Sequence, residues 1–336
     1  MARREIIEDE LMERTSYITP ITPRDQDLFR RYGTEFKASI HYHARECGGW
    51  NQGGESESRL GMKYFDGGNL ATFAFFKQDP GCFVVIPLKS DDDHLEELVS
   101  ELNTVSGSKV YLTTVGIEQA DRLVRRSAAF TFVKGDDSVA RGFCRETFPA
   151  RVVGIERMLY EAMGSGSFLY TGSIKFKKKY RGYSFQGYNP ASDEEKVKSL
   201  FRDVLEESQS RYHPEDFWNM LKSNDPLLDR DIFLIDGKFV GFLAGERDDD
   251  IFNIYAIIAR KEYAHLKEFM LFEKLIQVYR THSIWQANLG GSETQEEDTF
   301  KRKIPLIWSK NYDTLLFDPP RTMAPISTLE FSTRMR

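Results

Sequence analysis

Two glycines and a serine, Gly290-Gly291-Ser292, follow a short predicted strand and precede a predicted helix. Glycine at that place lets the backbone approach a ligand closely or take a positive φ. Ser292 can cap the helix, whose N-terminal amides attract anions. The run Lys301-Arg302-Lys303 stands near the far end of this helix, where cations ordinarily complement the helix dipole. The spacing is therefore typical either of an anion site or of a plain turn and cap.

A second stretch suited to binding is KFKKKYRGYSFQGY, residues 175–188, in which cations are interleaved with aromatic rings. Cations pair with phosphates and aromatic faces stack on bases, so the stretch is a candidate nucleic-acid contact. The alternative is a solvated amphipathic segment that binds nothing. The cations in question are Lys175, Lys177, Lys178, Lys179 and Arg181.

Metal-ligating and catalytic motifs are scarce. His41 and His43 are two residues apart, as on one face of a strand, and Cys47 lies nearby, but no fourth ligand is evident, so we expect no metal site. The three cysteines, Cys47, Cys82 and Cys144, are too few and too far apart for a disulfide framework or a structural zinc site. The sequence holds no GxSxG, HExxH, Walker A or GxGxxG motif, which leaves hydrolase, zinc protease, NTPase and Rossmann functions without support.

The composition is that of an ordinary globular protein, with 336 residues, 40% hydrophobic and 29% charged, which is long enough for two domains. The net charge of −6 excludes a generally basic surface, so any nucleic-acid contact must be local. No apolar run reaches the roughly 18 residues of a membrane helix, and the first twenty residues lack the apolar core of a signal peptide. We expect a cytoplasmic protein that is a monomer or a dimer.

The elements that position these residues begin with a predicted helix over 25–36. The turn signal Asp66-Gly67-Gly68 separates two strand-like runs, 60–65 and 70–76, and predicts a hairpin. Strands and helices then alternate, over 82–86, 93–105, 110–114, 118–128 and 130–133. This order predicts an α/β domain over residues 1–150.

Residues 151–190 are set apart as a basic-aromatic connecting segment that ends at Asn189-Pro190. A capping box at 192–195 opens the C-terminal domain, which we expect to span 191–318, before a tail over 319–336. The expected helices and strands of this domain, with a hairpin turn at Asp236-Gly237, cover 192–205, 214–221, 231–246, 251–258, 263–280, 285–289, 293–301 and a last strand near Leu315.

The element order over about 192–316 resembles the GNAT (N-acetyltransferase superfamily) fold, in which a central strand and the strand after the next helix diverge around an acyl donor. The motif from Asn288 to Thr294, followed by Phe300-Lys301-Arg302-Lys303, is similar to the signature of the Fem-like and BioF-like branch. Ile304 stands where that signature ends in Phe. The resemblance implies an α/β (α+β) chain of two GNAT-like domains, each a mixed, mostly antiparallel sheet flanked by helices.

The same resemblance implies an acyltransferase that forms an amide from an activated ester and an amine. Backbone amides of the strand over 251–258 would stabilise the oxyanion with help from Lys301, Glu246 would take the amine proton, and strand alternation could aim Tyr255 into the cleft. The ordinary alternatives for these three are a surface lysine, a solvated carboxylate and a core tyrosine. The implied substrate-binding residues are Asn288, Gly290, Gly291, Ser292, Glu293 and Lys303.

The loop after the central strand, Arg260 to His265, has no glycine, whereas CoA-using members of the superfamily wrap the CoA pyrophosphate with a glycine-containing loop. This difference favours aminoacyl-tRNA over acyl-CoA as the donor, with residues 175–181 as the candidate tRNA contact and a small amine as the acceptor. The donor is then a co-substrate, and we expect no tightly bound cofactor. Two alternatives stay open: an acyl-CoA-dependent N-acyltransferase, and a non-catalytic GNAT-like module that binds a ligand.

Overall fold

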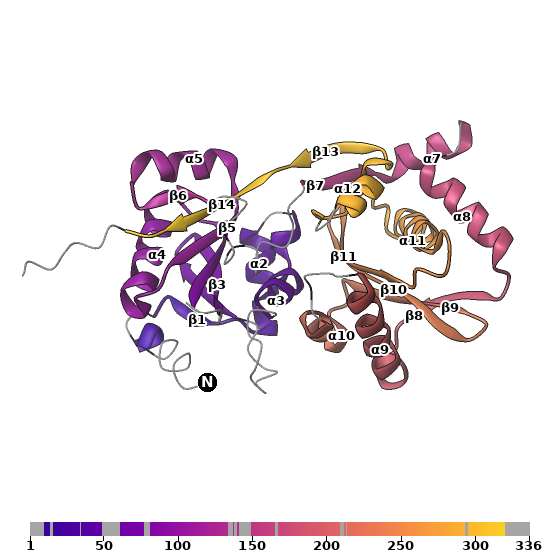
Figure 1. The fold of residues 1–336 in the computed structure, drawn as a ribbon, viewed down its shortest axis with the longest axis horizontal. Coiled ribbons are helices and arrows are strands. Elements are labelled where there is room, and N and C mark those ends of the chain that lie inside the picture. Colours follow the sequence, from indigo (N-terminus) through magenta and orange to yellow (C-terminus); the bar gives the residue numbers. More distant parts are fainter. Residues whose placement is uncertain are drawn as a thin grey trace, which may run out of the picture.

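Two seven-stranded sheets lie side by side in the computed structural model, one built mainly from the N-terminal half of the chain and one mainly from the C-terminal half (Figure 1). The structure describes residues 10–13, 16–33, 35–48, 61–76, 81–133, 137, 140, 149–164, 167–208, 212, 214–292 and 295–319. Helices flank both sheets, so the expected α/β class with two mixed sheets is confirmed.

The first sheet has the strand order β1-β2-β3-β4-β5-β14-β6. Its strands are β1 (Ile18–Pro20), β2 (Met62–Asp66), β3 (Asn69–Phe76), β4 (Cys82–Lys89), β5 (Val110–Gly116), β14 (Tyr312–Phe317) and β6 (Phe130–Phe132). The predicted hairpin joins β2 to β3, and Gly67 takes the positive φ of 56° that its turn requires. The helices of this half are η1 (Pro23–Asp25), α2 (Gln26–Tyr32), η2 (Glu35–Ala38), α3 (Ile40–Gly48), α4 (Asp92–Ser106) and α5 (Ile117–Arg126).

The second sheet has the order β13-β7-β12-β11-β10-β9-β8. Its strands are β13 (Leu306–Lys310), β7 (Ala150–Gly154), β12 (Gln286–Asn288), β11 (Ile251–Ala259), β10 (Lys238–Asp248), β9 (Leu228–Ile235) and β8 (Tyr183–Gly187). The predicted hairpin between β9 and β10 turns at Asp236-Gly237, where both residues have positive φ. The helices are α7 (Ile155–Gly164), α8 (Phe168–Lys179), α9 (Pro190–Ser208), η4 (Pro214–Phe217), α10 (Trp218–Lys222), α11 (Leu266–His282) and α12 (Gln295–Arg302).

The two sheets repeat one pattern. In each, antiparallel strands lead to a third strand, a helix follows, and the next strand lies parallel to the third, as β5 does to β4 and β12 to β11. These are the parallel pairs of the two sheets, and the other paired strands are antiparallel. This is a mixed, mostly antiparallel sheet, built twice.

The strand beside each parallel pair comes from a distant part of the chain. β14, expected in the C-terminal domain, instead pairs with β5 of the first sheet, with Leu315 opposite Leu112. β7 and β8 lie in the segment 151–190, which we expected to be a connection, yet both belong to the second sheet. The crossing from β13 to β14 runs over the top of the molecule (Figure 1). An alternating apolar pattern predicts a strand but not its partner, which is why the sequence does not reveal this exchange.

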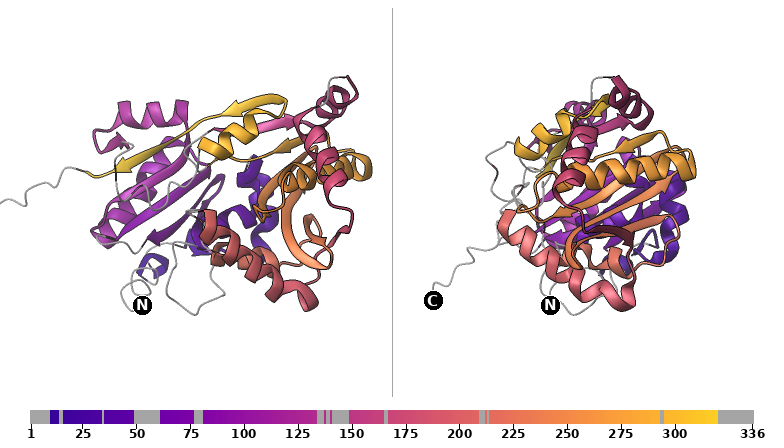
Figure 2. Two further views of the ribbon diagram at one scale, coloured as in Figure 1. Left: turned by 45° about the vertical axis from the view of Figure 1, so that its right-hand side comes forward. Right: turned by 90° about the vertical axis from the view of Figure 1, so that its right-hand side faces the viewer.

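Helices cover both faces of the second sheet, α9 on one face and α11 on the other (Figure 2). The side chains of β10 alternate between the two faces, and both faces are apolar: Phe242 and Ala244 pack with α9, whereas Leu243, between them, packs with α11. The core around α9 also contains residues of the first half, such as Tyr42 and Val84, so the two halves share one apolar interface.

One local prediction is wrong. His41 and His43 lie on helix α3 and not on a strand. His43 is buried, its Nε2 is 3.0 Å from the Lys37 carbonyl oxygen, and its Nδ1 is 2.9 Å from Thr72 Oγ1. Burial lowers the pKa of His43 to about 3, so this imidazole is neutral and belongs to the core. Cys47 has no described side chain, so the suggested grouping with it lies outside the described residues.

None of the helices that the structure describes is long and apolar enough to cross a membrane.

Candidate functional site

β11 and β12 diverge in the middle of the second sheet. They pair in parallel only from Ile251 opposite Gln286 to Asn253 opposite Asn288, while β11 continues to Ala259. After Asn288 the chain stays with β7 instead: the Leu289 amide donates to the Arg151 carbonyl (2.9 Å), and the Arg151 amide donates to the Gly290 carbonyl (3.2 Å). Beyond Asn253, no described strand pairs with this edge of β11.

A cavity of about 500 Å³ lies along this edge. β11 from Asn253 to Ala259, the turn from Asn288 to Gly291 and α12 line it. We call the part lined by the buried residues Asn253, Asn288, Gly291 and Lys301 its closed end. Of the residues implied for the site, five line the cavity: Tyr255, Asn288, Gly290, Gly291 and Lys301. The sequence motif and the central strand therefore do meet in space.

The point of divergence is held by two buried asparagines. Asn288 Nδ2 donates to Asn253 Oδ1 at 3.2 Å, and Asn288 Oδ1 accepts from the Gly290 amide at 2.9 Å. Gly290 has a φ of 65°, a conformation that favours glycine. Asn253 is not among the site residues predicted from the sequence, although its polar side chain interrupts the apolar run over 251–258, and this interruption was the available signal.

Lys301 reaches back from α12 to this turn. Its ammonium donates to the Gly291 carbonyl and lies 3.4 Å from Glu297 Oε1, and only 7% of the residue is exposed. The cation thus sits at the closed end of the cavity, next to the point where the strands part. This is the location at which a positive charge can stabilise a developing oxyanion.

A buried ion pair sets the position of α12. Asp298 is fully buried, and its Oδ1 accepts from Arg151 Nε (3.0 Å) and Nη2 (2.8 Å), while its Oδ2 accepts from Arg302 Nε (2.6 Å). Burial alone would raise the pKa of Asp298, but the hydrogen bonds from both arginines outweigh it and hold the pKa below its ordinary value. Asp298 and Arg151 were missed by the sequence reasoning, because they are 147 positions apart.

The remaining residues of the motif lie elsewhere. Ser292 is buried three positions before α12 begins, so it does not take the expected capping position, and its hydroxyl has no hydrogen-bond partner among the described residues. The Lys303 ammonium lies 5.0 Å from the centre of the Phe168 ring, outside the cavity. Glu293 lies outside the described residues.

Glu246 lies behind Tyr255 and does not line the cavity. Tyr255 lines it, and the Tyr255 hydroxyl donates to Glu246 Oε2 at 3.4 Å. Glu246 is 2% exposed; Ser39 donates to its Oε2, while Arg30 Nη2 (2.8 Å) and Gln26 Nε2 (3.1 Å) donate to its Oε1. Among the described hydrogen-bond partners of this carboxylate, Tyr255 is the one that also lines the cavity.

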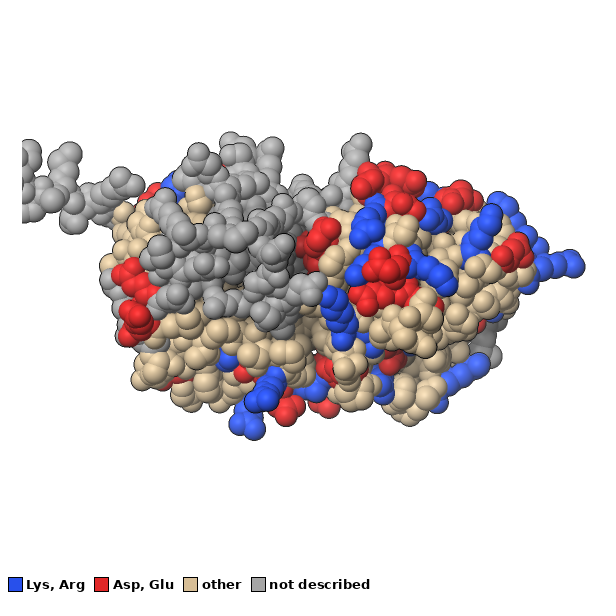
Figure 3. Space-filling model, turned by 90° about the horizontal axis from the view of Figure 1, so that it is seen from below, with Lys and Arg blue, Asp and Glu red and all other residues tan. Residues whose placement is uncertain are grey.

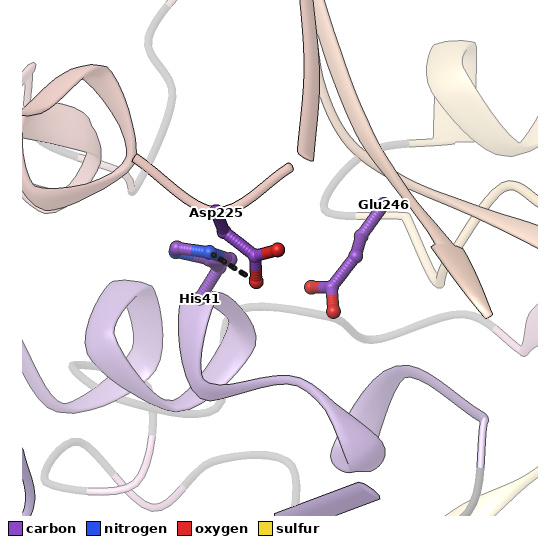
Figure 4. Close-up of side chains that lie close together, drawn as sticks. All are labelled: His41, Asp225 and Glu246. Atoms are coloured by element: carbon purple, nitrogen blue, oxygen red, sulfur yellow. Dashed lines mark ion pairs between the residues drawn. The ribbon is translucent and has the colours of Figure 1, made fainter. Parts of the chain in front are cut away.

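His41 and Asp225 adjoin this carboxylate, and Figure 4 shows the Asp225 and Glu246 carboxylates facing each other. His41 Nε2 is 3.6 Å from Asp225 Oδ2. Burial would raise the pKa of Asp225, but His41, the Leu227 amide and Arg30 lower it to about 2. Three such side chains could bind a metal ion, yet Arg30 Nη2 already bridges both carboxylates, at 3.1 Å from Asp225 and 2.8 Å from Glu246. A guanidinium in that position repels a second cation.

Two lysines that the sequence reasoning did not select stand at the mouth of the cavity. Lys261, just after β11, and Lys267, in the first turn of α11, are exposed and line it. We call them the mouth lysines. They stand where the glycine-free loop meets α11, so side-chain cations are present where a glycine-rich loop would have offered amides.

The basic-aromatic stretch separates into two faces. Its rings pack inward, with Phe176 stacked on Phe269 at 4.3 Å and Tyr183 at 5.0 Å from the same ring, so these rings are core residues. Lys177 pairs with Glu273 at 2.6 Å. The five cations are exposed, and none of them is among the described residues that line the cavity. On the face seen from below, charges of both signs are interspersed (Figure 3).

The first half has a corresponding divergence, and it is filled. β4 and β5 pair only from Phe83 opposite Val110 to Val85 opposite Leu112. Past that point the buried Lys37 of η2 donates to both the Pro87 carbonyl (2.9 Å) and the Thr114 carbonyl, bridging the two strands. A side chain of the protein thus occupies the place that the cavity occupies in the second half.

Searches with protein-family models and among curated proteins found no match to this chain. Solved structures do share its fold. FemX is 9% identical with a TM-score of 0.60, over 90% of this chain and 97% of that one. L-PGS from Bacillus licheniformis is 16% identical with a TM-score of 0.57, over 90% and 94%. A conserved protein of unknown function from Bacteroides thetaiotaomicron is 11% identical with a TM-score of 0.65, over 89% and 98%. The expected fold of two similar halves, each a mixed sheet flanked by helices, is therefore confirmed and is shared with FemX.

Proposed function

We propose that this protein is an acyltransferase that moves an acyl group from an activated ester or thioester onto an amine, forming an amide. The observation that carries the proposal is the cavity where β11 and β12 diverge, which has a buried lysine at its closed end. A donor bound beside β11 can present its carbonyl at the point of divergence. The fold shared with FemX and with a putative lysylphosphatidylglycerol synthetase from Agrobacterium fabrum (10% identical, TM-score 0.58) supports this class of reaction.

The reaction needs no covalent enzyme intermediate. The amine nitrogen attacks the carbonyl carbon, and the resulting oxyanion is stabilised by backbone N–H groups at the edge of β11 and by Lys301. The proton from the nitrogen passes to the Tyr255 hydroxyl as the tyrosine's own proton passes to Glu246. The bond from carbon to the leaving oxygen or sulfur then breaks, and the leaving group takes up a proton. Holding the two substrates together in the cavity contributes much of the acceleration.

For the donor we propose aminoacyl-tRNA ahead of acyl-CoA. Both are anionic, and the mouth lysines are placed to contact phosphate groups. The loop from Arg260 to His265 lacks the glycines with which a backbone wraps a pyrophosphate closely, and this supports the tRNA donor. The exposed cations of 175–181 are then a second, more distant phosphate contact. The acceptor is a small molecule that carries an amine.

The test is a filter-binding titration with total tRNA charged with a mixture of amino acids, at low and moderate salt, followed by transfer assays. Saturable binding that depends on aminoacylation, together with amide formation on an added amine, is the expected result. If acetyl-CoA instead raises the melting temperature, the acyl-CoA-dependent alternative replaces it. Ligand binding without any turnover would identify a non-catalytic binding module.

Neutralising the mouth lysines together, as Lys261→Gln with Lys267→Gln, is expected to weaken tRNA binding and to lower the slope of log affinity against log salt by about 1.5 to 2, since two phosphate contacts are lost. The measurement is the salt dependence of filter binding for both proteins. Lys109→Gln, an exposed lysine of the first half, is the control. An unchanged slope would remove these lysines from the donor site.

Changing Lys177, Lys178 and Lys179 of α8 to glutamine is expected to weaken binding of both charged and uncharged tRNA, because these cations lie outside the cavity and cannot sense the acyl group. Acyl transfer at saturating donor should then be nearly unchanged. Filter binding and single-turnover rates separate the two effects. Equal affinity of the variant and the original protein would show that α8 is a solvated helix face.

A further inference from the structure

Glu246 belongs to the second sheet, but most of its hydrogen-bond donors come from the first half of the chain. Gln26, Arg30 and Ser39 supply them, and Tyr255 is the donor from its own sheet. The contacts join residues more than 200 positions apart. Both carboxylate oxygens are engaged, so the orientation of the group is determined by the neighbouring half.

The three donors are held in turn by local structure. Gln26 and Arg30 are one turn apart on α2, so their side chains lie on the same face. Gln26 Oε1 accepts from the Ile40 amide at 3.1 Å, which ties α2 to the start of α3. Ser39 Oγ accepts from the His41 amide at 3.1 Å while donating to Glu246. Few rotamers satisfy all of these bonds at once, and the donors are therefore preorganised.

The segment that carries these three donors, residues 26–42, has two further roles. Lys37, within it, fills the divergence of the first sheet, so the described part of the first half keeps no corresponding cavity of its own there. Tyr42, at its other end, lines the cavity of the second half. Residues 26–42 thus close one cleft and complete the other.

We infer that residues 26–42 are the first half's contribution to the reaction, and that Gln26, Arg30 and Ser39 are positioning residues that hold the Glu246 carboxylate against the Tyr255 hydroxyl. This inference rests on the proposed function, because it assigns these residues to a proton path that the acyl transfer uses. It gives the first half a role at the active site, although Lys37 fills the divergence of β4 and β5 in the described part of that half.

Other charged and titratable groups surround Glu246: His41 of α3, Asp225 before β9 and Asp248 at the end of β10. Burial and the neighbouring carboxylates raise the pKa of Asp248. Arg30 is the cation that contacts both Glu246 and Asp225. Removing its charge leaves acidic groups facing one another, so a carboxylate there holds its proton to higher pH.

The decisive variant is Arg30→Gln, with Arg31→Gln, an exposed neighbour on the same helix, as the matched control. The probes are mixed aminoacyl-tRNA as the donor and one mixture of ethanolamine, spermidine and glycylglycine as the acceptor, so that titration of the acceptor is common to all variants.

We expect Arg30→Gln to lower kcat about 10- to 100-fold with donor affinity unchanged. We also expect the acidic limb of the kcat profile to move to higher pH, and Arg30→Lys to restore part of the rate. Arg31→Gln should match the original protein.

If the contact between Arg30 and Glu246 were purely structural, Arg30→Gln would lower the melting temperature but leave the rate per folded molecule and the pH profile unchanged. That result, or equal rates for Arg30→Gln and Arg31→Gln, would overturn the inference. If Arg30→Gln does not fold, Ser39→Ala removes one hydrogen-bond donor to Glu246 without removing a charge. It should lower kcat about 10-fold, again with the affinity for aminoacyl-tRNA unchanged. An inactive original protein with every donor would instead overturn the proposed function, and this inference with it.

Discussion

Replacing Lys301 with glutamine is expected to lower the rate of acyl transfer about 100- to 1,000-fold, the usual cost of losing one preorganised group that stabilises an oxyanion. The buried ammonium lies at the closed end of the cavity, between the Gly291 carbonyl and Glu297. In such a site a positive charge is more effective than in water, because solvent does not screen it. The measurement is the initial rate with mixed aminoacyl-tRNA and an added amine, at saturating donor.

Two comparisons make this result specific. Lys109→Gln changes an exposed lysine of the first sheet by the same chemistry and should leave the rate unaltered. Donor affinity should also be nearly unchanged in Lys301→Gln, because the mouth lysines contact the phosphates. A variant that keeps the original rate would exclude Lys301 from the chemical step, whereas a loss of binding alone would make it a donor ligand.

Replacing Asp298 with asparagine is expected to lower the free energy of unfolding by about 3 to 5 kcal/mol, because it leaves Arg151 buried without its anion. Arg302 contributes little of this, since its side chain is 58% exposed. Urea unfolding followed by circular dichroism measures the change. Asp121→Asn is the control: it breaks an exposed pair with Arg125 and should cost no more than about 0.5 kcal/mol.

The pH dependence of this ion pair has a definite sign. The pKa of Asp298 is lower in the folded than in the unfolded chain, so its contribution is complete above the unfolded value, 3.8, and is lost as the pH falls through the folded value. The original protein and Asp298→Asn should therefore differ most near neutral pH and converge in acid. A difference in stability that stayed constant down to pH 2 would contradict this account. Because Asp298 anchors the helix that carries Lys301, the variant should also transfer acyl groups more slowly.

Local patterns in the sequence were sufficient for much of the fold. Turn residues with a positive φ mark both hairpins, at Gly67 and at Asp236-Gly237, because few other residues adopt that conformation. An apolar run interrupted only at Asn253 marks β11 as a buried strand, and apolar residues at helical spacing mark α4 and α9. Two residues of the predicted motif, Asn288 and Lys301, both line the cavity.

Spacing alone misassigned two features. His41 and His43 alternate as on a strand, but they lie on α3, where packing against Thr72 and Phe29 buries His43. The aromatic residues over 176–183 have the spacing of a surface that stacks on bases, yet Phe176 and Tyr183 pack against Phe269 instead. Both patterns are compatible with two environments, and only the tertiary contacts distinguish them.

The sequence by itself determined many of the elements of this protein, the motif at the strand divergence and the identity of the lysine beside it. Only the tertiary structure decided which sheet β7 and β14 would join, that Arg151 would bind Asp298, and that the first half would hold Glu246. The physical reason is range: turn chemistry and periodicity act between residues a few positions apart. A strand partner or an ion pair across more than 100 positions depends on how the whole chain packs, and it leaves no local pattern to find.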